Sequence, residues 1–147
     1  MSDASAFPLA SRPRLWTRAT ALGGIAWNLF GAIQLVGSVT ATRDSLMASG
    51  LTADQATVMT GYPAWMTLAF AAGVTGGLAG SVLLLLRRPE AAGVLALSLA
   101  GYVGLWIGDA IHGVFAEMGA PQIIILSLVV AIAGALLAVA LRQDATS

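Results

Sequence analysis

Four long apolar stretches, separated by polar segments, set the pattern of this chain. The stretches cover residues 19–40, 64–86, 91–113 and 122–141. A helix needs about 20 apolar residues to cross a hydrocarbon core of roughly 30 Å, and each stretch provides that length. Short connections place consecutive helices antiparallel. The pattern therefore predicts an all-α fold, an integral membrane four-helix bundle formed by residues 19–141.

The polar segments complete this layout. Residues 1–18 contain two prolines and three arginines and are expected to form a disordered basic leader, whereas residues 142–147 form a polar tail. The long connection, residues 42–63, carries Thr52 and Gln55 at capping-box spacing, which predicts a short interfacial helix after Thr52. An apolar run behind arginines also fits a signal peptide. The first stretch is longer than the roughly 7–15 residues of a signal h-region, so we expect a retained helix.

The composition agrees with a membrane protein. Hydrophobic residues make up 58% of the chain and charged residues 10%, whereas soluble domains carry about a quarter charged residues. The seven basic residues are all arginines and form no long tract, which excludes a nucleic-acid partner. The chain has no cysteine, which excludes disulfides and thiol chemistry.

The arginines predict the orientation of the bundle. Six of the seven flank one side of the predicted spans: Arg12, Arg14, Arg18, Arg87, Arg88 and Arg142. Arg43 is the one arginine on the other side. By the positive-inside rule both termini lie in the cytoplasm and the 42–63 loop is periplasmic, which indicates a multi-pass protein of the bacterial inner membrane.

The third stretch contains the most unusual polar residues. Tyr102, Trp106, Asp109 and His112 recur at helical spacing and share one face. Counting about 1.5 Å per residue from the cytoplasmic face places Asp109 roughly 27 Å up, in the outer third of the membrane. An acid within a membrane helix is a functional candidate. We therefore expect an outward-facing substrate-binding cluster made of Asn28, Gln34, Tyr102, Trp106, Asp109 and His112.

Simpler interpretations stay open beside this one. Asp109 and His112 would also suit a helix end in the headgroup region, bonded to each other at i,i+3. Asn28 would suit an interhelical hydrogen bond. His112 is the only histidine, and no motif places a nucleophile or a second metal ligand beside it. We expect no enzyme activity, no metal and no cofactor.

Small residues form two seams that predict helix packing. The second and third stretches contain glycines at spacings of three and four, which let helices approach closely in lipid. These glycines are Gly73, Gly76, Gly77, Gly80, Gly101, Gly104 and Gly108. Because four short spans enclose little volume, we expect a homo-oligomer or a place in a larger membrane complex, with these seams as contacts.

Several segments together resemble a known group of proteins. They are Ala21–Gly31 with Trp27-Asn28, Tyr62-Pro63-Ala-Trp65, Gly76-Gly77-Leu-Ala-Gly80, Leu83–Arg88 and Leu95-Ala-Leu-Ser98. Over about residues 20–100 the chain is similar to small four-span bacterial inner-membrane proteins that are often labelled sugar transporters. The resemblance implies the four-span topology and the inner-membrane location. Together with the polar cluster it favours solute transport or binding, and the alternative is a non-catalytic accessory subunit.

Overall fold

The computed structural model describes residues 12–146, and the side chains of residues 15–145. Within this range the chain forms helices and no strand. The helices are α1 (Arg12–Thr40), α2 (Arg43–Ala48), α3 (Ala53–Thr60), α4 (Ala64–Leu85), α5 (Ala91–Ile111), α6 (Val114–Met118) and α7 (Ala120–Thr146).

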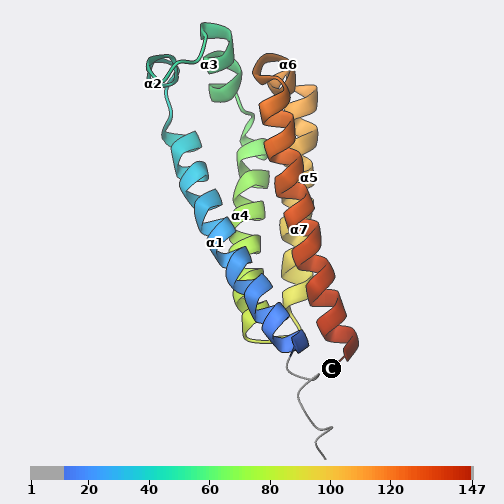
Figure 1. Ribbon diagram of the computed structural model, residues 1–147. Helices are drawn as coiled ribbons and strands as arrows, with labels where there is room; N and C mark the ends of the chain where they lie inside the picture. Colours follow the sequence, from blue (N-terminus) through green and yellow to red (C-terminus); the bar gives the residue numbers. More distant parts are fainter. Residues whose placement is uncertain (1–11, 147) are drawn as a thin grey trace, which may run out of the picture.

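The four long helices, α1, α4, α5 and α7, form an antiparallel bundle (Figure 1). Each is long and apolar enough to cross a membrane. The short helices α2, α3 and α6 gather at one end, and α1 begins and α7 ends at the other (Figure 1). α4 packs between α1 and α5, and α5 also packs against α7. The predicted all-α four-helix bundle is confirmed, and the chain has the architecture of a small multi-pass membrane protein.

The helix ends differ from the sequence prediction at both termini. α1 begins at Arg12 and not near residue 19, so the prediction of a disordered leader is wrong for residues 12–18. A proline in the first turn removes only an N–H that a helix leaves unpaired there, so Pro13 does not stop the helix. α7 continues to Thr146 and includes most of the predicted tail. Residues 1–11 lie outside the described part of the chain.

The segment between α1 and α4 forms a helical cap at one end of the bundle. Thr52 accepts a hydrogen bond from the backbone N–H of Gln55, and the Gln55 side chain accepts from the backbone N–H of Thr52. This is the predicted capping box. The Nε2 amide of Gln55 also donates to the carbonyl of Glu117 in α6 at 3.3 Å. The cap is therefore tied to the turn that joins α5 to α7.

Glycines bring α4 and α5 into close contact. A Cβ atom on Gly73 would lie 2.6 Å from the ring of Tyr102, and one on Gly101 would lie 2.6 Å from the carbonyl oxygen of Ala69. Gly76 lies against the backbone of Ser98. Gly104 is looser, because a Cβ there would make only an ordinary contact. Most of the predicted seam is thus occupied within a single chain.

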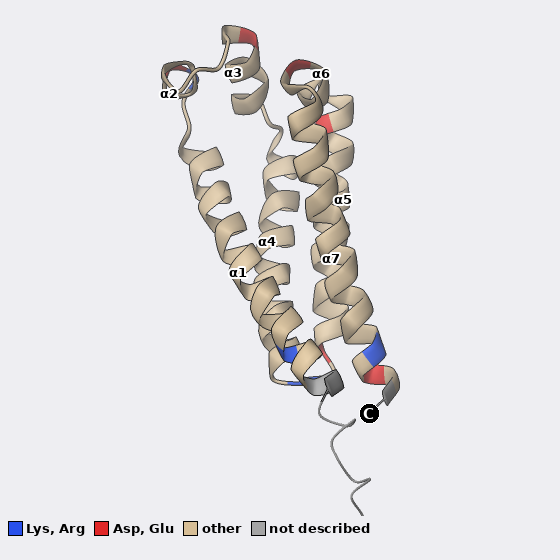
Figure 2. Cartoon of the chain, viewed as in Figure 1, with Lys and Arg blue, Asp and Glu red and all other residues tan. Residues whose placement is uncertain are grey.

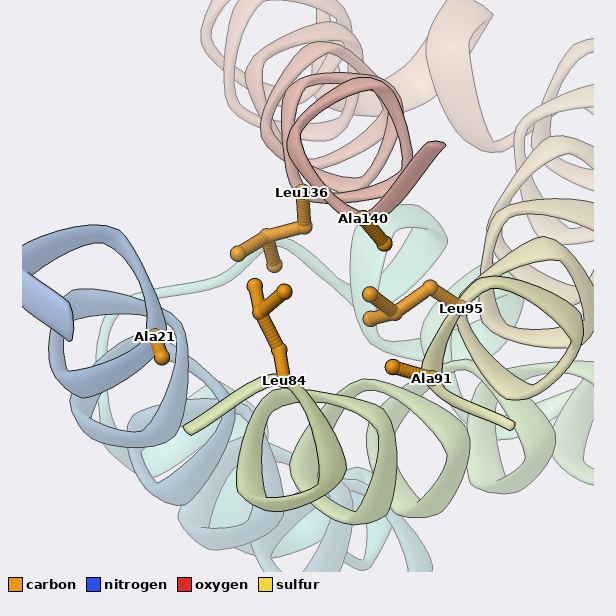
Figure 3. Packing of buried hydrophobic residues seen from close by; sticks show 6 residues of the cluster. All are labelled: Ala21, Leu84, Ala91, Leu95, Leu136 and Ala140. Atoms are coloured by element: carbon orange, nitrogen blue, oxygen red, sulfur yellow. The ribbon is translucent and has the colours of Figure 1, made fainter. Parts of the chain in front are cut away.

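Buried apolar side chains form three layers along the bundle. Figure 3 shows the layer nearest the chain termini, which contains Ala21, Leu84, Ala91, Leu95, Leu136 and Ala140. The middle layer contains Val74, Tyr102 and Ala133. The layer beneath the cap contains Met66, Leu105 and Leu126. Three buried polar side chains, those of Asn28, Ser81 and Ser98, lie among these apolar layers.

Charged residues lie almost entirely at the two ends of the bundle (Figure 2). Arginines occur where α1 begins, in the turn between α4 and α5 and near the end of α7, whereas acidic residues dominate the cap and α6 (Figure 2). This distribution leaves an apolar band between the ends, as a membrane requires. Asp109 is the exception, because it lies within α5.

Candidate functional site

Asp109 is a fully buried acid near the cap end of α5, with a relative exposure of 0%. Its Oδ2 atom accepts a hydrogen bond of 2.9 Å from the Nε2 amide of Gln122 in the first turn of α7. Its Oδ1 atom has no hydrogen-bond partner among the described residues. No described residue forms an ion pair with it. The carboxyl group is therefore only half satisfied by the protein.

Tyr62 is the second neighbour of this carboxyl group. It lies in the segment between α3 and α4, close enough to Asp109 for the two side chains to interact electrostatically. Burial raises the pKa of Tyr62 above its ordinary range, and the Asp109 carboxyl raises it further. The phenol therefore keeps its proton and can offer it to an oxygen atom.

Two tight turns bring Asp109 and Gln122 together. α5 ends at Ile111, and Gly113 then takes a left-handed conformation (φ 79°) that only glycine adopts freely. Gly119, also at positive φ (77°), reverses the chain between α6 and α7. These turns set the start of α7 beside the end of α5, so residues 13 positions apart form a hydrogen bond across two helices.

The surroundings of the site are apolar. The layer of Met66, Leu105 and Leu126 carries partly buried aromatic side chains, among them Tyr62, Phe70, Trp106 and Phe115. Gly108 lies against the Met66 side chain and leaves no room for a Cβ atom. An isolated charge is costly in such surroundings, where water is excluded.

Trp106 belongs to the apolar wall around Asp109 and forms no hydrogen bond with the Asp109 carboxyl group. Its indole Nε1–H donates to the Ser127 hydroxyl at 3.0 Å, and its ring meets Phe115 edge-on at a centroid distance of 5.2 Å. The indole donor is thus already used by α7. Trp106 holds α5, α6 and α7 together beside Asp109.

Asn28 and Tyr102 form a separate polar pair deeper in the bundle. The Tyr102 hydroxyl donates to Asn28 Oδ1 at 2.9 Å, and Asn28 Nδ2 donates to the carbonyl of Gly24 at 2.8 Å. Seven residues, about 10 Å along α5, separate Tyr102 from Asp109. These two predicted site residues therefore lie outside the Asp109 site, and Asn28 makes an interhelical hydrogen bond.

His112 and Gln34 also lie outside the site. α5 ends before His112, which is exposed and faces the Trp65 ring at a centroid distance of 6.0 Å. It therefore does not pair with Asp109 as a continuous helix would allow. Gln34 is exposed on α1. The sequence predicted one outward cluster, but the structure divides its residues over four places. These are the Asp109 site with Trp106 in its wall, the Asn28–Tyr102 pair, the exposed His112 and the exposed Gln34.

The sequence interpretation missed Gln122 and Tyr62. In the sequence Gln122 marks only the start of the fourth predicted span, and Tyr62 only contributes to the family resemblance. The only signal in the sequence was the polar Gln122 at the start of an apolar stretch, and it does not say which side chain the glutamine meets. Comparison with protein-family models, curated proteins and solved structures found no match for this chain.

Proposed function

We propose that this multi-pass membrane protein binds a small cationic solute at Asp109, from the end of the bundle that carries the cap. The observation that carries the proposal is the fully buried carboxyl group of Asp109, whose Oδ1 atom has no partner among the described residues. A buried carboxylate without an ion pair is unfavourable unless a cation or proton neutralises it.

The neighbouring groups suit an ammonium or similar small cation. Gln122 holds Oδ2 and fixes the carboxyl group, which leaves Oδ1 as the acceptor for a donor on the solute. The Tyr62 oxygen can accept a second hydrogen bond, and the ring of Trp106 lies in the adjacent wall. Aromatic faces stabilise cations by about 0.5–2 kcal/mol.

The layers below the site support binding from one side. Between Asp109 and the far end lie the Val74–Tyr102–Ala133 layer and the layer of Figure 3, whose members are apolar apart from the Tyr102 hydroxyl, which already donates to Asn28. Ser81 Oγ is the other buried side-chain atom without a partner among the described residues. A cation crossing these layers would lose its hydration without replacement. Transport through one bundle would need both layers to move, so binding is the step that this conformation favours.

We also propose the orientation and location. The arginines at the end opposite the cap support a cytoplasmic position for both termini, and the cap then faces the periplasm of a bacterial cell. A binding role, and not catalysis, suits a site without an activated nucleophile.

The test is a thermal-shift screen of the detergent-purified protein with small amines, sugars and carboxylic acids. A solute at about one hundred times its dissociation constant stabilises the folded state by roughly 2.7 kcal/mol. We expect amines to raise the Tm of the wild type and of Asp54→Asn, which alters an exposed acid in the cap. Asp109→Asn should lose the shift. A shift that persists in Asp109→Asn, or that only sugars or acids produce, would contradict the proposal.

A further inference from the structure

We infer that a second copy of this chain packs along α1, with the Gln34 amides of the two copies hydrogen-bonded to each other. Gln34 is exposed and forms no hydrogen bond with any residue in the described range 12–146. It lies six residues, about 9 Å, beyond the buried Asn28 and within the candidate span Leu15–Thr40. Hydrocarbon provides no partner for an amide, so a protein group is needed.

Of the four long helices, α1 is the least buried within the bundle. Of the 18-residue apolar stretch that makes α1 long enough to span a membrane, only 11% is buried, against 39% for the corresponding stretches of α4 and α5. Its packed face consists of Ala21, Gly24, Asn28 and Gly31. Gln34 belongs to a different face, and Figure 1 shows α1 at the edge of the bundle. The residues of this second face are Gly23, Trp27, Phe30, Gln34 and Gly37, at spacings of four, three, four and three.

The glycines of this face make no close packing contact within the described part of the chain. A Cβ atom on Gly23 or on Gly37 would meet nothing within 4 Å. By contrast, Gly73, Gly77 and Gly101 lie directly against neighbouring side chains or backbone. The seams that the sequence suggested for contact between chains are thus filled inside the bundle. The small residues left free on α1 flank the unpaired amide instead.

A second copy is the partner that this face fits. Two copies in one membrane share the same orientation, so their Gln34 residues lie at the same depth. An amide both donates and accepts, so two facing amides satisfy each other across a two-fold axis. The alternating spacing of three and four is that of two parallel helices packed side by side. Glycines above and below the amide let the two helices approach.

The cysteine-free chain permits a direct test in lipid membranes. Phe30→Cys and Gly37→Cys place a thiol within roughly 60° of Gln34 around the helix. Leu29→Cys and Val36→Cys are matched controls, because these exposed residues lie roughly 140–160° away from Gln34. After mild oxidation we expect disulfide-linked dimers from Phe30→Cys and Gly37→Cys, and monomers from the two controls.

A second variant tests the amide itself. Adding Gln34→Leu to Gly37→Cys should weaken association roughly tenfold, as expected for losing an interhelical hydrogen bond in a membrane. Three results would overturn the inference: equal cross-linking at all four positions, cross-linking at the controls only, or none at any position. An undiminished dimer yield with Gln34→Leu would also overturn it. Solute binding at Asp109 is independent of each of these outcomes.

Discussion

Two buried polar pairs lie seven residues apart on α5, and the protein satisfies them to different degrees. In the Asn28–Tyr102 pair, Asn28 Oδ1 accepts from the tyrosine and its Nδ2 donates to the carbonyl of Gly24. In the Asp109–Gln122 pair, one carboxyl oxygen accepts from the glutamine and the other has no partner among the described residues. Both Asn28 and Asp109 are buried almost completely.

The difference distinguishes a structural pair from the proposed binding group. A completed hydrogen bond contributes about 0.5–1.5 kcal/mol, whereas a buried polar atom left without a partner costs about 1–3 kcal/mol. The first pair therefore stabilises the contact of α1 with α5. The second pair lowers stability, and such sites are expected where function requires them. The variants below test this distinction, from the largest expected effect to the smallest.

The largest effect should come from Gly77→Ala. A Cβ atom on Gly77 would lie 2.5 Å from Cγ of Asn28, so the alanine must displace Asn28 from Tyr102. Overpacking together with the lost hydrogen bond should cost about 2–4 kcal/mol of unfolding free energy, measured by SDS titration in mixed micelles. Gly134→Ala in α7 is the control, because a Cβ there meets nothing within 4 Å. Equal losses for both variants would show that the contact at Gly77 is unimportant.

Tyr102→Phe should have a smaller effect of the same kind. The substitution keeps the ring against Gly73 and removes the hydroxyl that donates to Asn28 Oδ1. The unfolding free energy should fall by about 1–2 kcal/mol, because a buried acceptor is left unpaired. Amine binding should persist, since Tyr102 belongs to the structural pair. If a folded Tyr102→Phe protein no longer bound amines, the Asn28–Tyr102 pair and the Asp109–Gln122 pair would belong to one binding site.

The smallest effect concerns how the stability of the folded protein depends on pH in the alkaline range. Because the pKa of Tyr62 is raised in the folded state, the unfolded chain loses its phenolic proton first as the pH rises above about 10. The unfolded state then binds fewer protons than the folded state, so stability falls as the pH increases. Tyr62→Phe should show a shallower decline between about pH 9 and 11 in thermal unfolding. An unchanged slope would indicate that the pKa of Tyr62 is not raised in the folded protein.

The sequence predicted the bundle well because membrane helices follow simple rules. Apolar length located α1, α4, α5 and α7, and the capping box located α3. The sequence also singled out Asp109 as a candidate, since an acid within an apolar stretch requires an explanation. These features depend on local composition alone.

The partners of the polar residues could not be predicted from the sequence in the same way. Each partner depends on how far a helix is rotated against its neighbours, which packing decides. Tyr102 and Asp109 lie on one face of α5, yet the former meets α1 and the latter meets α7. The interruption of α5 before His112 and the exposure of Gln34 likewise depend on tertiary contacts.

The most direct test compares the stabilities of Asp109→Asn and Asn28→Leu without any solute. Asn28→Leu leaves the Tyr102 hydroxyl unpaired, so its Tm in detergent should fall clearly below that of the wild type. Asp109→Asn removes a buried charge and keeps an acceptor for Gln122, so its Tm should equal or exceed that of the wild type. If both variants lost stability to the same extent, Asp109 would be a structural residue like Asn28, and the proposed binding site would be contradicted.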